Sequence, residues 1–171
     1  MTPSTEFRTE FRTETRPDDV AAVRDLAAAT AYFSTSEVAI AAELVEERLQ
    51  KGPASGYEFL YADGDGRLDG YACYGLIPCT LSSYDLYWIA VHPDTQGTGL
   101  GRRLLQECER RIRALGGTGV YAETSGKAQY VSTRRFYERC DYATGAVFAD
   151  FYGPGDDKYV FVKKLGVSSP S

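Results

Sequence analysis

Histidine is nearly absent from this chain of 171 residues, since His92 is the only one. A histidine-based catalytic triad and a multi-histidine metal site are therefore both disfavoured, and we predict no metal. Cysteine is also scarce, and the few that occur are widely spaced without the pairing of metal ligands: Cys73, Cys79, Cys108 and Cys140. Cys108 falls on the apolar face of an expected helix, so the pattern favours reduced thiols and a cytoplasmic location over a disulfide framework.

Long hydrophobic runs are missing as well. No stretch of about 18 apolar residues occurs, so we expect no membrane span. The first residues are rich in threonine, glutamate and arginine without an apolar core, so we expect no signal peptide. The formal net charge of −5 argues against nucleic acid as a partner and mildly favours a small cationic substrate.

The patterning that is present predicts one α+β domain over residues 1–171, with flexible tails at 1–5 and 166–171. Alternating apolar and polar residues predict strands at 6–15, 57–62, 68–77, 84–91, 120–124, 143–151 and 159–165. A period near 3.6 residues predicts helices at 19–31 (with Asp18 as N-cap), 36–51, 102–115 and 130–140. We expect a central mixed, mostly antiparallel sheet of about six to seven strands, flanked by about four helices.

A glycine-rich loop from Gln96 to Gly101 (Gln-Gly-Thr-Gly-Leu-Gly) separates the strand expected at 84–91 from a long amphipathic helix. Backbone N–H groups at a helix N-terminus have no internal partners, and the helix dipole there is positive. Because glycines let a phosphate approach the main chain closely, we predict a pyrophosphate-binding loop. A glycine-rich connection without a ligand is the alternative.

Two other nucleotide-binding motifs fit this loop less well. The spacing is not Gly-x-Gly-x-x-Gly, and the connector after Val91 is too long for the tight first turn of a dinucleotide-binding fold. No Lys-Ser/Thr pair follows Gly101, which argues against a Walker-type loop.

The loop resembles the Gln/Arg-x-x-Gly-x-Gly/Ala signature of the GCN5-related N-acetyltransferase (GNAT) superfamily. Downstream, residues 133–142 (Thr-Arg-Arg-Phe-Tyr-Glu-Arg-Cys-Asp-Tyr) are similar to the family's Ala-x-x-Phe-Tyr-x-x-x-Gly-Phe segment. Order and spacing agree over residues 57–165. Tyr130 departs from the asparagine of many relatives, and Asp141 replaces the usual glycine.

The resemblance implies acetyl-CoA as the donor of an acetyl group. In the family, backbone amides of the strand before the loop and of the loop itself hold the pantetheine and the pyrophosphate. Carried over by position, and with two residues of the downstream helix, the cofactor-binding residues are Ile89, Ala90, Val91, Gln96, Gly97, Thr98, Gly99, Leu100, Gly101, Arg102, Thr133 and Phe136.

Tyr137 aligns with the tyrosine that the family often uses as a general acid toward the leaving thiolate. A phenol with an ordinary pKa of about 10 can protonate, or hydrogen-bond, a thiolate whose conjugate acid has a pKa of about 8.5. The alternative is that Phe136 and Tyr137 simply pack their helix on the sheet.

An acceptor amine must lose a proton before it attacks, and a nearby carboxylate would help. Asp85 stands where some relatives carry a glutamate base, so it is one candidate. Glu123 is the other, and it could equally recognise a cationic acceptor. An exposed charge at the end of a strand is the alternative for Asp85.

These residues together predict a direct N-acetyltransferase acting on a primary amine of a small acceptor. The second hypothesis is a catalytically inactive acetyl-CoA-binding sensor or interaction module of the same fold. Dimerisation is common in the family, and the edge strands of the hairpin at 143–165 could support a homodimer.

Overall fold

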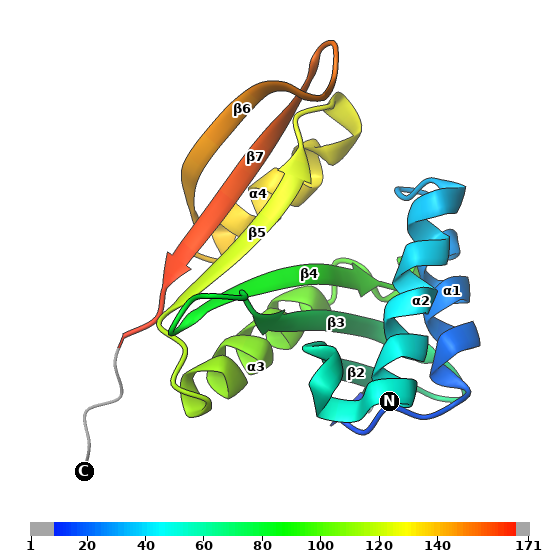
Figure 1. Cartoon of the computed structure of the whole chain (residues 1–171). Coiled ribbons are helices and arrows are strands. Elements are labelled where there is room, and N and C mark those ends of the chain that lie inside the picture. The colour runs from blue at the N-terminus through cyan, green and yellow to red at the C-terminus, as the bar shows by residue number, and fades with distance from the viewer. Residues whose placement is uncertain (1–8, 167–171) are drawn as a thin grey trace, which may run out of the picture. The chain divides into compact units, whose positions relative to one another are not determined.

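A seven-stranded sheet with the order β1-β2-β3-β4-β5-β7-β6 runs through the chain, and four α-helices accompany it (Figure 1). This computed structural model describes residues 9–166. β4 and β5 pair in parallel, whereas β1 with β2, β5 with β7 and β6 with β7 pair antiparallel. The predicted α+β class, with a mixed and mostly antiparallel sheet, is confirmed.

The observed elements lie close to the predicted ones. The strands are β1 (Glu10–Arg12), β2 (Glu58–Asp63), β3 (Leu68–Leu76), β4 (Ser83–Val91), β5 (Gly119–Ser125), β6 (Ala143–Gly153) and β7 (Asp156–Lys164). The helices are α1 (Asp19–Ala29), α2 (Thr35–Lys51), α3 (Leu100–Ala114) and α4 (Val131–Arg139). The predicted tail 1–5 and residues 167–171 of the predicted tail 166–171 lie outside the described residues, and Gly166 comes two residues after the end of β7.

The chain divides into two compact units, which are described separately. The first consists of Met1–Cys73 and Trp88–Leu104, and the second of Tyr74–Tyr87 and Leu105–Ser171. No helix within residues 9–166 has both the length and the apolar character that crossing a bilayer requires.

In the first unit, α1 and α2 pack their apolar faces on the sheet. The shared core contains residues of both helices and of β2, β3 and β4, namely Val23, Leu26, Ala27, Ala41, Val45, Phe59, Tyr61, Leu68, Tyr71, Cys73 and Ala90. Leu49, near the end of α2, is 38% exposed. The core therefore takes the middle of α2 but not its last turn.

The start of α1 agrees with the prediction, whereas the start of α2 differs from it. Asp18 occupies the predicted N-cap position of α1, although its side chain makes no capping bond. The neighbouring Asp19 is the buried carboxylate, and it accepts a hydrogen bond from the Arg16 backbone N–H at 2.6 Å and from both terminal nitrogens of Arg12. α2 begins one residue earlier than expected, because Ser34 and Glu37 form a reciprocal capping box.

β1 is shorter than the strand predicted at 6–15. Its described part ends at Arg12, whose guanidinium binds Asp63 of β2 and Asp19 of α1. Arg12 thereby joins the end of β1 to the start of α1, and the chain leaves the sheet at this residue. Residues 6–8 lie outside the described part of the chain.

In the second unit, α4 packs on β7, and β6 and β7 form a long hairpin. The turn is tighter than the predicted 152–156, since β6 continues to Gly153 and β7 already begins at Asp156. Main-chain N–H groups of Asp150 and Gly155 donate to the carboxylates of Asp157 and Asp150, which closes the hairpin end. Leu115, expected on the apolar face of α3, lies beyond the end of the helix and is 60% exposed.

Candidate functional site

The glycine-rich loop lies in the first unit, directly before the fifteen-residue helix α3. Gly97 and Gly99 both adopt the left-handed conformation, with φ of 76° and 84°, and a Cβ on either would meet nothing within 4 Å. The Gly99 carbonyl accepts from the Arg103 N–H at 3.1 Å, which makes it the first acceptor of the helix. The amides of the first turn then have no partners inside the helix, as an anion-binding site requires.

The segment that leads into the loop is held by hydrogen bonds. The side-chain amide of Gln96 donates to the Val91 carbonyl at 3.2 Å, and the Thr98 hydroxyl donates to the Thr95 carbonyl at 2.6 Å. The His92 N–H donates to the Asp69 carbonyl at 2.7 Å. The loop is thus fixed at both its start and its middle, while Gly97 and Gly99 remain exposed.

A salt-bridge bracket, formed by Arg67, Asp69 and Asp94, supports this segment from the β2–β3 hairpin. Arg67 places Nε 3.0 Å from Asp69 Oδ1 and Nη1 2.7 Å from Asp94 Oδ2. Asp69 is 2% exposed, and its Oδ2 has no hydrogen-bond partner within residues 9–166. The hydrogen bond from Arg67 holds the pKa of Asp94 below its ordinary value of 3.8. Sequence reasoning missed this bracket, because only the folded hairpin brings Arg67 to Asp94.

The strand residues predicted to bind the cofactor lie at the end of β4. Ala90 is buried in the core, whereas Ile89 and Val91 are half-buried. Arg102, in the first turn of α3, is exposed. These residues and the loop all belong to the first unit.

Tyr137 lies in the second unit on α4 and is only 4% exposed. Its ring stacks on Phe161 of β7 at a centroid distance of 5.3 Å and contacts Phe136 and Tyr142 at 5.4 and 5.5 Å. Burial raises the pKa of this phenol well above its ordinary value. Tyr137 is therefore a neutral hydroxyl at physiological pH, able to donate a hydrogen bond.

Thr133 and Phe136 are half-buried on the same helix. The loop that leads into α4 is held by Arg134, which donates to the Ser125 and Lys127 carbonyls at 2.7 and 3.1 Å. Lys127 Nζ in turn lies 3.2 Å from Asp156 Oδ2.

The two predicted acidic residues come together in the second unit. Asp85 of β4 pairs with Tyr121 of β5, and Glu123 follows two residues later on the same face of the sheet. Lys158 of β7 joins them, with Nζ 2.7 Å from Glu123 Oε1. Sequence reasoning missed Lys158, because the β5–β7 register that brings it to Glu123 is not visible in a local pattern.

Asp85 is half-buried, and its surroundings perturb it. Burial, together with the charge of Glu123, raises its pKa above the ordinary 3.8, while Lys158 acts in the opposite direction. No cation lies within ion-pair distance of Asp85 in the part of the chain that the structure describes. Its carboxylate is thus a better proton acceptor than that of an ordinary aspartate.

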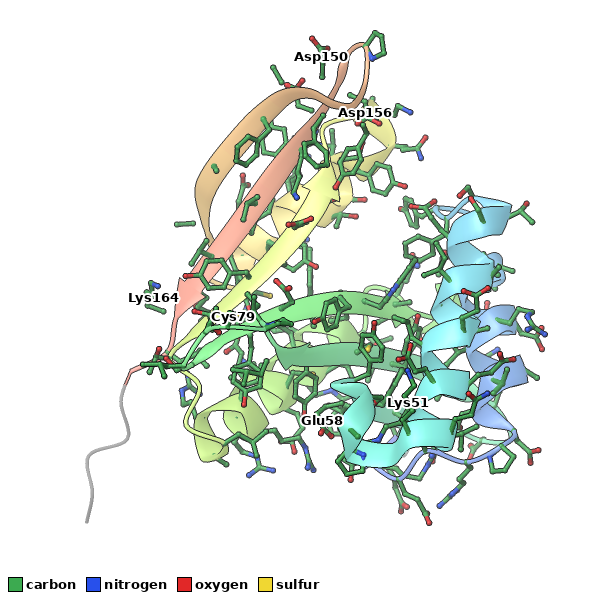
Figure 2. All side chains as sticks on the ribbon, in the orientation of Figure 1. Lys51, Glu58, Cys79, Asp150, Asp156 and Lys164 are labelled. Atoms are coloured by element: carbon green, nitrogen blue, oxygen red, sulfur yellow. The ribbon has the colours of Figure 1, made fainter. Side chains whose placement is uncertain are left out.

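An aromatic patch, Phe148, Phe151 and Tyr152, continues from Lys158 along β6. Lys158 Nζ lies 4.4 Å from the centroid of the Phe151 ring. Phe151 contacts Phe148 and Tyr152 at centroid distances of 6.3 and 5.0 Å, and all three side chains are at least half exposed, at 51%, 56% and 50% in chain order. Asp150 and Asp156 mark the end of the same hairpin (Figure 2).

All four cysteines are free thiols, and Cys73, Cys108 and Cys140 are buried. Burial raises the pKa of the Cys108 thiol, which leaves it inert as a nucleophile. Within residues 9–166, no three histidine, cysteine, aspartate or glutamate side chains gather in a way that could hold a metal ion.

Comparison with known proteins extends these observations. The family model of the acetyltransferase (GNAT) domain matches residues 55–144. No curated protein matches the chain. Among solved structures, a protein from Desulfovibrio desulfuricans assigned to the acetyltransferases of the GNAT family is 45% identical, with 93% of this chain and 100% of that chain covered and a TM-score of 0.92.

Two more distant structures share the fold. One is a protein from Salmonella typhimurium, assigned as an acetyltransferase and solved with its cofactor acetyl-CoA, with 20% identity, 96% of this chain and 98% of that chain covered, and a TM-score of 0.72. The other is an aminoglycoside 6'-N-acetyltransferase complexed with coenzyme A, with 19% identity, 95% and 99% coverage, and a TM-score of 0.73. The matched domain and the 45% identity over nearly the whole length decide the family: this chain belongs to the GNAT acetyltransferases.

Proposed function

We propose that this acetyltransferase moves the acetyl group of acetyl-CoA directly to a primary amine of a small acceptor. The observation that carries the proposal is the loop with left-handed Gly97 and Gly99 open in front of the N-terminus of α3. The solved relatives with bound coenzyme A or acetyl-CoA support the choice of donor. We propose further that residues 1–171 act as one cytoplasmic N-acetyltransferase domain, which the free, largely buried cysteines support.

The diphosphate of acetyl-CoA is the group that the loop fits. Free amides at the start of α3 and the positive end of its dipole favour a doubly charged anion. Exposed glycines leave room for the phosphate oxygens to reach the main chain. Arg102 supplies a positive charge in the first helical turn.

Proton transfer from the acceptor is the role we assign to Asp85. An amine with a pKa of about 10.4 is almost wholly protonated at neutral pH, so it needs a base before it attacks the thioester. The raised pKa of Asp85 makes this carboxylate a stronger base than an ordinary aspartate. Glu123, already paired with Lys158, is assigned instead to holding that lysine beside the acceptor.

The transfer itself forms the N–C bond and breaks the C–S bond. The ammonium gives one proton to Asp85 before the attack, coenzyme A departs as a thiolate, and the second proton that the nitrogen loses as the amide forms passes to this thiolate or to water. Tyr137 is assigned to stabilise this thiolate by donating a hydrogen bond. Its raised pKa favours donation from a neutral phenol over full ionisation.

A covalent route through cysteine has no support in the structure. Cys108 has a raised thiol pKa, and the single histidine uses Nδ1 to accept from the Asp94 N–H at 3.2 Å. A thiol needs a lowered pKa or an adjacent base to act as a nucleophile. Direct transfer is therefore the simpler mechanism.

The test is release of coenzyme A from acetyl-CoA across a panel of polyamines, aminoglycosides, amino acids, simple monoamines and peptide N-termini. We expect amine-dependent release with at least one class. Tyr137→Phe should then lower kcat with little change in the Kd of acetyl-CoA. Tight binding of acetyl-CoA without turnover on any amine would favour a sensor instead, and unchanged turnover of Tyr137→Phe would remove the role of Tyr137.

A further inference from the structure

The face of the second unit that carries Asp85 is distinct from the face that α4 covers. Side chains alternate along β7, and Phe161 points toward α4, where it stacks on Tyr137. Lys158 lies on the opposite face, together with Glu123 of β5. Phe148 of β6 pairs directly with Lys158 and so shares that face.

Most carboxylates of this unit near that face are already engaged. Glu123 is paired with Lys158, and Asp156 with Lys127. Asp150 and Asp157 accept main-chain N–H groups at the hairpin end. Asp85, by contrast, has neither an ion-pair partner nor a hydrogen-bond partner within residues 9–166, and it is half-buried. The face therefore offers one carboxylate that no other group of the described residues binds, together with one fixed ammonium.

The aromatic patch begins where this charge cluster ends. Contacts run without a break from Glu123 to Lys158, from Lys158 to Phe151, and from Phe151 to Phe148 and Tyr152. Half-exposed rings of this size gain free energy when an apolar group covers them. A carboxylate at Asp85 on one side of Glu123 and Lys158, and an apolar surface on the other side, match a molecule with one ammonium and an apolar body.

We propose that the acceptor is a small monoamine with an aromatic or apolar body, its ammonium at Asp85 and its body on Phe148, Phe151 and Tyr152. This inference rests on the proposed function and names its substrate class. Lys158 is the residue that determines specificity. It neutralises Glu123 and repels a second positive charge, so polyamines are poor acceptors.

Three amines separate the contributions: phenethylamine, butylamine and cadaverine. Phenethylamine carries one ammonium and a ring, butylamine lacks the ring, and cadaverine carries a second ammonium. We expect kcat/KM for phenethylamine to exceed that for each of the others by about tenfold or more, as burial of a ring and repulsion of a second charge both predict.

Variants of this face should change the preference among the three amines. Loss of an aromatic ring should weaken the use of phenethylamine, whereas loss of Lys158 should favour cadaverine. Phe148→Ala and Phe151→Ala should each lower kcat/KM for phenethylamine about tenfold and leave that for butylamine nearly unchanged. Lys158→Gln should raise the relative use of cadaverine, because Glu123 becomes free for the second ammonium, whereas Lys158→Arg should keep the wild-type preference. Leu81→Ala changes a fully exposed apolar residue in another turn, so it is the control that should change nothing.

The outcomes distinguish the proposed acceptor class from the proposed N-acetyltransferase activity. Equal use of phenethylamine and butylamine, or a wild-type preference for cadaverine, would overturn the inference while leaving N-acetylation standing. Binding of acetyl-CoA with no acetylation of any amine would overturn both. If Phe151→Ala instead abolished a dimer and left the amine preference unchanged, the patch would be an interface between copies of this chain.

Discussion

Arg67 Nη1 lies 2.7 Å from Asp94 Oδ2, and this contact ties the β2–β3 hairpin to the turn that precedes the glycine loop. The same guanidinium binds the buried Asp69, whose backbone carbonyl accepts from His92. The conformation of the proposed diphosphate loop therefore depends on a residue that precedes it by almost thirty positions. Four features of the molecule can be tested by substitution: this bracket, the glycine loop, the carboxylate of Asp85 and the ion pair between Lys163 and Glu109.

Loss of the Arg67 bracket should weaken acetyl-CoA binding and also destabilise the fold, because the buried Asp69 carboxylate loses its cation. Arg67→Met removes both ion pairs, and we expect the Kd of acetyl-CoA to rise about threefold to tenfold, as for other positioning contacts. Arg67→Lys should recover part of the affinity because it keeps the charge. Calorimetric titration measures both, and Lys51→Gln, which breaks an exposed pair on α2, serves as the control. Unchanged affinity for acetyl-CoA in Arg67→Met would show that the bracket does not position the loop.

The left-handed loop gives a second prediction, with a control of equal backbone strain. Gly99→Ala should cost about 1–2 kcal/mol of unfolding free energy, because a Cβ disfavours positive φ. It should also raise the Kd of acetyl-CoA well above that strain effect, because the Cβ occupies the space of a phosphate oxygen. Gly66 has φ of 77° and equally open surroundings in the β2–β3 turn, so Gly66→Ala should cost similar stability without affecting acetyl-CoA. If Gly99→Ala and Gly66→Ala lost the same affinity for acetyl-CoA, backbone strain alone would explain the loss.

Asp85 should show opposite effects on activity and stability. Its pKa is raised in the folded state, so the folded protein binds this proton more tightly than the unfolded chain does. Stability therefore falls as pH rises through the interval between the unfolded and folded pKa values, and the penalty persists at neutral pH. Asp85→Asn should raise the melting temperature at neutral pH, with a gain that disappears below the ordinary carboxylate pKa.

The same variant should lose most amine acetylation and the acid limb of its pH–rate profile. The groups facing Asp85 are Glu123, Lys158 and Tyr121, so Glu123→Gln is the informative comparison. Glu123→Gln should raise KM for the amine while keeping the acid limb. If Asp85→Asn kept both the rate and the acid limb, Asp85 would not be the base.

A buried charge network in the second unit sets the fourth prediction. Lys163 Nζ lies 3.0 Å from Glu109 Oε2 and donates to the Cys140 carbonyl at 3.0 Å, while Tyr142 donates to Glu109 at 3.1 Å. Lys163→Met leaves a 3% exposed carboxylate without its cation and should cost about 3–5 kcal/mol of unfolding free energy. Adding Glu109→Gln should restore part of that loss in denaturant titrations. A double variant less stable than Lys163→Met would contradict this interpretation.

The elements were largely predictable from sequence because their signals are local. The glycine loop, the amphipathic α3 and the alternating strands each depend on residues close together in the chain. Misjudged boundaries, such as the start of α2 and the end of β1, depend on the Ser34–Glu37 capping box and on the Arg12–Asp19 pair. These polar contacts set the boundaries of the elements, and the spacing of apolar residues contains no information about them.

The candidate site was predictable only in part, for a similar reason. Asp85, Glu123 and Tyr137 could be named one by one from their positions. Lys158 could not, because the β5–β7 pairing that brings it to Glu123 is non-local. Arg67 was missed for the same reason. Side chains that act through partners far apart in sequence need the fold before they can be recognised.

The most direct measurement of the central claim follows the acetyl group itself. Wild-type protein is incubated with acetyl-CoA labelled in the acetyl group and with phenethylamine, and the products are identified by mass spectrometry. Direct N-acetyl transfer predicts labelled amide in equal amount to released coenzyme A. Label found only in free acetate, or retained on acetyl-CoA that the protein binds but does not consume across the whole amine panel, would contradict it.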